Sequence, residues 1–240
     1  TPNQYRWNFL AAPTAAEAIA GKKYSPLIAT ILAHRGVTSV AQADAFLNPS
    51  LNDLHDPATL HGCEQAANIL ADAIRAEKKI VIYGDYDVDG ITSVSILLSC
   101  ITLLGGAATH YIPHRLDEGY GVNPEALEEL IGAGAQLIVT VDCGVTAVET
   151  LAEFSGRGCE FIITDHHTPS SSLPNVAAVV HPALGDAAAN RDLCGAGVAF
   201  KLAWQTARAM CGNTRVDDDM KRFLLEATTL AALGTIADVV

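Results

Sequence analysis

The sequence has 240 residues, half of them hydrophobic, and a formal net charge of −12 at pH 7. This composition predicts one sizeable domain with a smaller appendage, and no apolar run reaches the roughly 18 residues that a membrane span needs. The negative charge argues against a plain basic surface for nucleic acid. The first ten residues do not resemble a signal peptide, and six scattered cysteines without a Cys-x-x-Cys pair favour a reduced, cytoplasmic protein over a disulfide or zinc framework.

The first 62 residues are expected to form a helical N-terminal region. The segments SPLIATILAHRG (25–36) and VTSVAQADAFLNPS (37–50) carry apolar residues at helical spacing, and they end at a glycine and at an Asn-Pro pair. A further helix is predicted over 63–76, where CEQAANILADAIRA begins a second and larger domain, residues 63–240.

From residue 79 onward, short apolar runs alternate with helical patterns. The runs LIVTV (137–141) and FIIT (161–164) are typical of strands that are covered on both faces. The alternation predicts an α/β fold with a doubly wound, mostly parallel sheet. The predicted strands are 79–83, 107–112, 136–141, 160–164 and 177–181, and the predicted helices are 91–104, 124–132, 145–154, 197–211 and 219–233.

Acidic and imidazole side chains stand where these predicted strands end. Because the carboxyl ends of parallel strands meet at one edge of a sheet, residues far apart in sequence are expected to converge there. Any one aspartate is ordinary as a helix cap or turn residue, but a whole group of such side chains favours a metal site. The group comprises Asp85, Asp87, Asp89, Asp142, Asp165, His166, His167 and His181.

The segment YGDYDVDGITS (83–93) is also similar to the start of a calcium-binding EF-hand loop, with alternate aspartates before Gly90. Counted from Asp85, however, the twelfth position holds Ile96 where such a loop needs a bidentate glutamate. The segment in front is a short β-branched run and not a helix. The calcium-loop interpretation therefore fails, and a catalytic metal site remains.

Four segments, in this order, resemble the successive motifs of the DHH phosphoesterase superfamily: GDYDVDGITS (84–93), VTVDCGV (139–145), ITDHHTP (163–169) and GTIADVV (234–240). The flanking segments FLNPSLNDLHDP (46–57), IPHRLDEGYGV (112–122) and LCGAGVAFKL (193–202) are similar to those of one branch, the RecJ family. That family comprises bacterial 5′→3′ exonucleases specific for single-stranded DNA. The resemblance runs from about residue 25 to the last residue.

The resemblance implies a centre of two divalent cations, Mn²⁺ or Mg²⁺. Carboxylates and imidazoles suit these ions, and two ions together supply a nucleophile and positive charge for hydrolysis of a phosphodiester. The resemblance assigns Asp142 to both ions and Asp87 to one of them. It assigns Asp89, His166 and Asp238 to the other ion.

Further roles are implied for the side chains around this centre. His167 is expected to face the scissile phosphate and to stabilise its charge, and Asp165 to orient an imidazole. Arg115 matches an arginine that contacts substrate phosphate, and its planar fork suits a terminal 5′-phosphate; a surface ion pair is the alternative. Tyr83 stands where small-molecule members of the superfamily usually carry histidine, so Asp85 is expected to fill that ligand position, directly or through water.

The segment GAGVAF (195–200) resembles a dinucleotide-binding loop, but no strand directly precedes it and Phe200 stands where a third small residue is needed. It is therefore predicted to be a glycine-rich turn that opens a helix. His181, at a strand end, is expected to make a hydrogen bond and not a metal bond.

The predicted function is metal-dependent phosphodiester hydrolysis, as a 5′→3′ exonuclease on single-stranded DNA in recombination and repair. The alternatives are a phosphodiesterase of the same family for short oligonucleotides or cyclic dinucleotides, and a non-catalytic replication scaffold. The resemblance implies a cytoplasmic monomer with no membrane partner, and with a single-strand-binding protein and a helicase as candidate partners. A DHH-associated domain and an oligonucleotide-binding domain are expected to lie outside this sequence and to supply the basic surface for DNA.

Overall fold

The computed structural model describes residues 8, 10–21, 23–114, 119, 121–185, 190–213 and 215–239. The chain divides into two compact units, Thr1–Leu54 and His55–Val240. None of the helices within the described ranges is long and apolar enough to cross a membrane.

The first unit is helical in its described part, in agreement with the patterns predicted over 25–50. Ser25 and Ser39 cap its second and third helices through their hydroxyl oxygens. The elements are α1 (Ala15–Ile19), α2 (Pro26–His34), α3 (Val40–Leu47) and a short 3₁₀ helix, η1 (Leu51–Asp53). A separate small core holds them together, formed by Ala16, Ile19, Tyr24, Ala29, Leu32, Ala33, Val37 and Ala43.

The second unit is built on a five-stranded sheet in which all the described strand pairs are parallel. The strands are β1 (Ile80–Tyr83), β2 (Ala108–Tyr111), β3 (Leu137–Val141), β4 (Glu160–Thr164) and β5 (Ala178–Val180), in the order β2-β1-β3-β4-β5. Ile80, at the start of β1, lies opposite Ala108 on one side and Leu137 on the other. The predicted α/β class with a mostly parallel sheet is confirmed.

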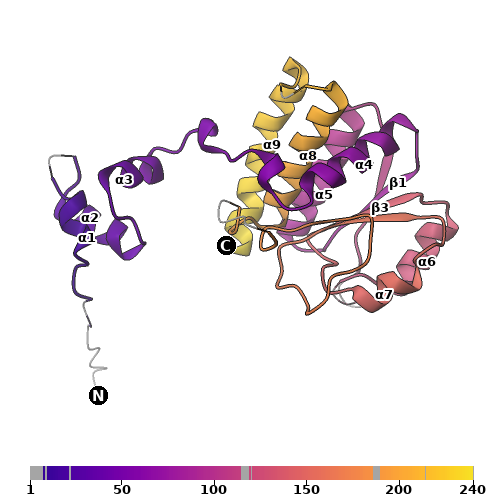
Figure 1. The fold of residues 1–240 in the computed structure, drawn as a ribbon, viewed down its shortest axis with the longest axis horizontal. Coiled ribbons are helices and arrows are strands. Elements are labelled where there is room, and N and C mark those ends of the chain that lie inside the picture. Colours follow the sequence, from indigo (N-terminus) through magenta and orange to yellow (C-terminus); the bar gives the residue numbers. More distant parts are fainter. Residues whose placement is uncertain are drawn as a thin grey trace. The chain divides into compact units, whose positions relative to one another are not determined.

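Helices cover both faces of this sheet (Figure 1). One face packs against α4 (Cys63–Arg75), α5 (Val88–Leu103) and α8 (Gly195–Cys211), with η2 (Pro57–Thr59) beside α4 and α8. Helix α9 (Asp218–Asp238) packs on α5 and α8 and extends the same core. The other face packs against α6 (Pro124–Gly132) and α7 (Val148–Glu153) through a second core that includes Leu127 and Leu151. The strands of the sheet interior are therefore buried on both sides, which explains their nearly continuous apolar sequence.

Three helices differ from their predicted bounds in a way that matters for the site. Helix α5 begins at Val88 and not at residue 91, because the Asp87 side chain caps it. Helix α8 begins at Gly195, two residues before the predicted start, with Cys194 as its cap. Helix α9 continues past the predicted end at residue 233 to Asp238, since Gly234 packs closely against α5 and α8 without interrupting the helix.

Candidate metal centre

The strand order reverses around β1. The chain passes from β1 to β2 on one side of it, and then to β3 on the other side. In open parallel sheets such a reversal leaves a crevice at the carboxyl ends of the two flanking strands, where ligands bind. The loop after β1 carries Asp85 and Asp87, and the loop after β3 carries Asp142. The topology therefore explains why these carboxylates meet.

The loop after β1 presents one buried and one exposed carboxylate. Asp85 is buried, and its Oδ1 accepts a hydrogen bond of 2.7 Å from the backbone N–H of Tyr86. Burial raises the pKa of Asp85, although that backbone hydrogen bond opposes the shift. The exposed Asp87 accepts a hydrogen bond of 2.9 Å from Gly90 N–H as the cap of α5. Both side chains are thus fixed by their own loop.

Asp89 lies in the first turn of α5 and is buried, with 1% of its surface exposed. Its two oxygens accept backbone hydrogen bonds from the beginning of α8. Gly195 N–H donates to Oδ2 at 2.6 Å and Ala196 N–H donates to Oδ1 at 2.9 Å. Asp89 is therefore held by a segment that follows it by more than a hundred residues in the sequence.

Asp142 follows β3 directly and has an uncommon backbone conformation. Its φ is +61°, in the left-handed region that non-glycine residues seldom adopt and that is over-represented at functional sites. The carboxylate is buried, with 1% exposure, and neither oxygen has a hydrogen bond of acceptable geometry. Burial, and to a lesser degree the charges of Asp89 and Asp87, raise the pKa of Asp142 to about 7, against the influence of His166.

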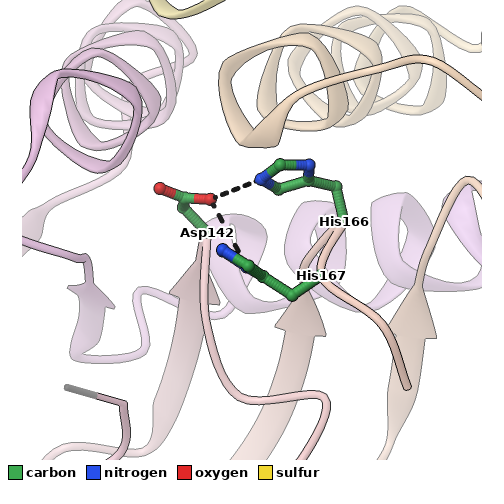
Figure 2. A group of neighbouring side chains, drawn as sticks. All are labelled: Asp142, His166 and His167. Atoms are coloured by element: carbon green, nitrogen blue, oxygen red, sulfur yellow. Dashed lines mark ion pairs between the residues drawn. The ribbon is translucent and has the colours of Figure 1, made fainter. Parts of the chain in front are cut away.

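The segment after β4 brings two neighbouring imidazoles to the same oxygen of the Asp142 carboxylate (Figure 2). His166 Nε2 lies 3.2 Å from Asp142 Oδ1, and His167 Nδ1 lies 3.9 Å from the same oxygen. Asp165, which precedes them, accepts hydrogen bonds from the backbone N–H groups of Val145, His166 and His167 and from His167 Nδ1. The hydrogen bond of 2.8 Å between His167 Nδ1 and Asp165 Oδ1 thus fixes the orientation of the His167 ring.

These contacts shift the pKa values of the pair in opposite directions. The Asp165 carboxylate raises the pKa of His167 to about 9. Burial alone would raise the pKa of Asp165, but the hydrogen bonds from His167 and Val145 bring it below its usual value. The pair therefore consists of an ionised carboxylate and a protonated imidazole in the metal-free protein.

His166 is surrounded by carboxylates. Its Nε2 lies 3.2 Å from Asp142 Oδ1, 3.6 Å from Asp238 Oδ2 and 3.7 Å from Asp89 Oδ2, and yet it makes no hydrogen bond of normal geometry. In the described part of the chain, four buried side-chain atoms lack a hydrogen-bond partner, and three of them are His166 Nε2 and the two oxygens of Asp142. Buried polar atoms without partners are costly, and a cation placed among them would satisfy all three. The residues present therefore fit a divalent cation.

The site contains three overlapping sets of potential ligand atoms, and within each set the atoms lie within 4.8 Å of one another. Asp142 belongs to two of the sets and His166 to two. This overlap suits two neighbouring ions that share ligands, and the hard oxygen and imidazole donors suit Mn²⁺ or Mg²⁺. The sets are Asp85–Asp87–Asp142, Asp142–His166–His167 and Asp89–His166–Asp238.

Other residues singled out in the sequence lie outside these sets. Tyr83 is buried and directs its hydroxyl to the segment before α6, where it donates to Gly121 O and accepts from Asn123 N–H, both at 3.1 Å. His181 uses both ring nitrogens, since Ala183 N–H donates to Nδ1 and Nε2 contacts the His167 carbonyl at 2.8 Å. The hydrogen-bonding role predicted for His181 is confirmed. Arg115 lies outside the described residues.

The predicted convergence at the sheet edge is found, but the supporting contacts of α8 and α9 were not anticipated. The segment GAGVAF was predicted only as a turn that opens a helix, whereas its first two amides bind Asp89. Asp238 is the last residue of α9. In the sequence, the glycine at position 195 was the one signal for the contact between α8 and Asp89, because a glycine permits close approach of backbone to a side chain.

Comparisons with known proteins agree with this architecture. The family model described as "DHH family, N-terminal domain" matches residues 79–235, and the chain belongs to the DHH family. Within that family, the chain is similar to the single-stranded-DNA-specific exonuclease RecJ of several bacteria. The Bacillus subtilis protein is 41% identical over 217 residues, which are 90% of this chain and 26% of that protein. The Thermus thermophilus protein is 39% identical over 240 residues, which are 99% of this chain and 33% of that protein.

Solved structures of these relatives share the fold. RecJ from Thermus thermophilus in complex with Mn²⁺ matches with a TM-score of 0.76 and 35% identity, over 100% of this chain and 33% of that chain. An exonuclease RecJ bound to manganese matches with a TM-score of 0.66 and 43% identity, over 75% of this chain and 44% of that chain. This chain thus spans between about a quarter and less than half of the relatives that it matches.

Proposed function

We propose that this chain is the catalytic part of a metal-dependent 5′→3′ exonuclease for single-stranded DNA, acting in recombination and repair. The observation that carries the proposal is the trio of unpartnered buried atoms on Asp142 and His166, surrounded by four further carboxylates. The relatives are exonucleases specific for single-stranded DNA, which indicates the substrate, and Thermus thermophilus RecJ has been solved in complex with Mn²⁺ and with Mg²⁺. Phosphodiester hydrolysis at two such ions accounts for the whole donor set.

Two cations, Mn²⁺ or Mg²⁺, would supply a nucleophile at neutral pH and positive charge beside the attacking and leaving oxygens. Asp142 would hold both of them. Asp85 and Asp87 would complete the position nearer β1. Asp89, His166 and Asp238 would complete the other position, as the overlapping sets of donor atoms suggest.

His167 is the proposed contact for the scissile phosphate. Asp165 fixes the ring through Nδ1 and keeps it protonated. An imidazolium of fixed orientation donates a hydrogen bond to developing negative charge without reorganising during the reaction. Asp165 is therefore a positioning residue for His167, since it accepts hydrogen bonds from that ring and from backbone N–H groups.

Arg115 is proposed to bind the terminal 5′-phosphate of the substrate, on the strength of the sequence alone. We further propose residues 63–240 as the catalytic domain and residues 1–62 as an N-terminal region, within a longer protein that works as a cytoplasmic monomer. Since the chain covers about a third of its relatives, the remaining length is the proposed source of the basic surface for DNA. A single-strand-binding protein and a helicase are the proposed partners.

The test uses the full-length protein on 5′-labelled single-stranded DNA and on dinucleotides, each with Mn²⁺ and then with EDTA. We expect metal-dependent release of labelled mononucleotide from the long substrate and little hydrolysis of dinucleotides. Preference for dinucleotides would favour the small-substrate enzyme, and no hydrolysis of either would favour a scaffold. In the same assay, Arg115→Ala should weaken the binding of 5′-phosphorylated substrate more than the binding of 5′-hydroxyl substrate. An equal loss of binding for both substrates would contradict the 5′-phosphate role.

A further inference from the structure

The first turn of α8 lies directly against two of the buried carboxylates of the candidate centre, Asp89 and Asp142. Gly195 and Ala196 donate their amides to Asp89, as described above. A Cβ atom on Gly195 would lie 2.6 Å from Asp142 Oδ1 and 2.7 Å from Asp142 Cβ, closer than real side-chain carbons approach. Only a glycine at this position leaves Asp142 where it is.

Helix α9 closes the same cluster from the other side. A Cβ atom on Gly234 would collide with Asp89 Oδ1, and it would lie 2.7 Å from the Cβ of Ala196. The neighbouring Thr235 lies 3.4 Å, Oγ1 to Sγ, from Cys194, the residue that caps α8. The first turns of α5 and α8 and the last turns of α9 therefore meet at Asp89.

We propose that Gly195, Ala196 and Gly234 are positioning residues that fix Asp89 relative to Asp142 and thereby set the geometry of the two ion positions. Two charge-assisted hydrogen bonds from amides at a helix N-terminus orient the Asp89 carboxylate. Each oxygen retains capacity to bind a cation beside His166 Nε2. The GAGVAF segment thus acts on the site through Asp89. This inference rests on the proposed metal assignment.

The experiment compares Gly234→Ala with Gly132→Ala in the full-length, metal-free protein. Gly132 is the last residue of α6, and a Cβ atom there meets nothing within 4 Å. Mn²⁺ titration calorimetry and thermal unfolding are measured for both variants. We expect Gly234→Ala to weaken Mn²⁺ affinity by about 10- to 100-fold, the range seen when partners of metal ligands are altered, and Gly132→Ala to bind as the unmodified protein does.

A second substitution separates an effect on Asp89 from an effect on helix packing. Ala196→Gly removes the methyl group that the new Cβ meets, but it leaves the collision with Asp89 in place. Gly234→Ala/Ala196→Gly should therefore regain thermal stability without regaining Mn²⁺ affinity. Recovery of both would overturn the proposal, as would unchanged affinity in Gly234→Ala. Absence of Mn²⁺ binding in the unmodified protein would instead overturn the metal assignment, and the proposal with it.

A measurement without metal keeps the proposal testable if these variants do not fold. In Asp89→Ala, the peptide that contains the Gly195 and Ala196 amides should exchange hydrogen about tenfold faster than in the unmodified protein, because both amides lose their acceptor. The Val198 amide, which donates to Cys194 O at 3.0 Å, serves as the internal control. Equal exchange in both proteins would show that Asp89 does not engage α8 and would overturn the proposal.

Discussion

Asp142 carries a combination of properties that opposes folding. Its backbone is in the left-handed region, its carboxylate is buried, and neither oxygen has a hydrogen bond. Strain and desolvation of this kind are found where function requires them. At the scale of a single residue, the metal-free site is therefore energetically unfavourable, and the proposed cation would offset this cost.

We expect Asp142→Asn to raise the melting temperature of the metal-free protein near pH 8 by several degrees and to abolish Mn²⁺ binding. The pKa of Asp142 is raised from 3.8 to about 7 by burial. Ionisation therefore opposes folding, fully above about pH 7 and progressively less as the pH falls towards 3.8. The gain should shrink over that window, because asparagine does not ionise. Calorimetry in EDTA at several pH values measures it.

Asp192→Asn is the matched control for this substitution, because Asp192 is exposed. The control should leave both the melting temperature and Mn²⁺ binding unchanged. An equal gain in the two variants, or no gain in Asp142→Asn, would mean that the buried charge does not limit the stability of the metal-free protein.

At the scale of secondary-structure elements, a residue between a strand and a helix can both cap the helix and serve as a metal ligand. Asp87 caps α5 through Gly90 N–H, and it also belongs to a set of potential metal ligands. An N-cap needs only an acceptor oxygen, whereas a metal ligand needs a charged carboxylate. The two tasks can therefore be separated by substitution.

We expect Asp87→Asn to keep the stability of the metal-free protein and to weaken Mn²⁺ binding, because asparagine caps helices about as well as aspartate. Asp87→Ala should weaken binding and also lower the free energy of unfolding by about 1 kcal/mol. Urea unfolding and Mn²⁺ titration measure the two effects.

Asp217, which caps α9 by accepting from Met220 N–H at 2.8 Å, offers the control. Asp217→Ala should lower stability by a similar amount and leave Mn²⁺ affinity intact. If Asp87→Asn binds Mn²⁺ as tightly as the unmodified protein, Asp87 is a cap and not a ligand.

The sequence allowed the prediction of elements whose signals are local. Helix α6 was predicted with its observed bounds, because Asn123 and Pro124 mark its first turn, and β4 was predicted with its observed bounds from an unbroken apolar run. The convergence of Asp142 and His166 followed from the rule that parallel strands end at one edge. The contact of Asp89 with α8 could not be predicted, because it depends on how two helices distant in sequence pack, and no local pattern encodes that distance.

At the scale of the whole molecule, net charge and length bear on the proposed binding of DNA. The chain carries 27 acidic and 15 basic residues, so its field repels a polyanion except where cations are bound. Two relatives match 90% and 99% of this chain, but the matched part is only 26% and 33% of their own length. Metal binding and strand binding are thus expected to depend on different parts of the full protein.

We expect residues 1–240 alone to fold, to bind Mn²⁺ and to degrade single-stranded DNA at least tenfold more slowly than the full-length protein. The sheet and its covering helices enclose two apolar cores. Strand binding needs positively charged surface, whereas this chain has a formal net charge of −12. Calorimetry and a nuclease assay on one preparation measure both. Equal nuclease rates in the two proteins would show that the remaining length is not needed for gripping the strand.

Helix α8 connects the candidate centre to the opposite end of the helix layer. Its first residue, Gly195, touches Asp142, and its last residue, Cys211, is exposed, whereas the other five cysteines are buried. A helix of 17 residues spans about 24 Å between its first and last residues. A nitroxide or fluorophore attached to the Cys211 thiol would therefore lie about one helix length, roughly 24 Å, from the end of α8 that contacts the candidate centre. The distance measured between such a label and a paramagnetic Mn²⁺ ion would test in solution whether the ion lies at that end of the helix.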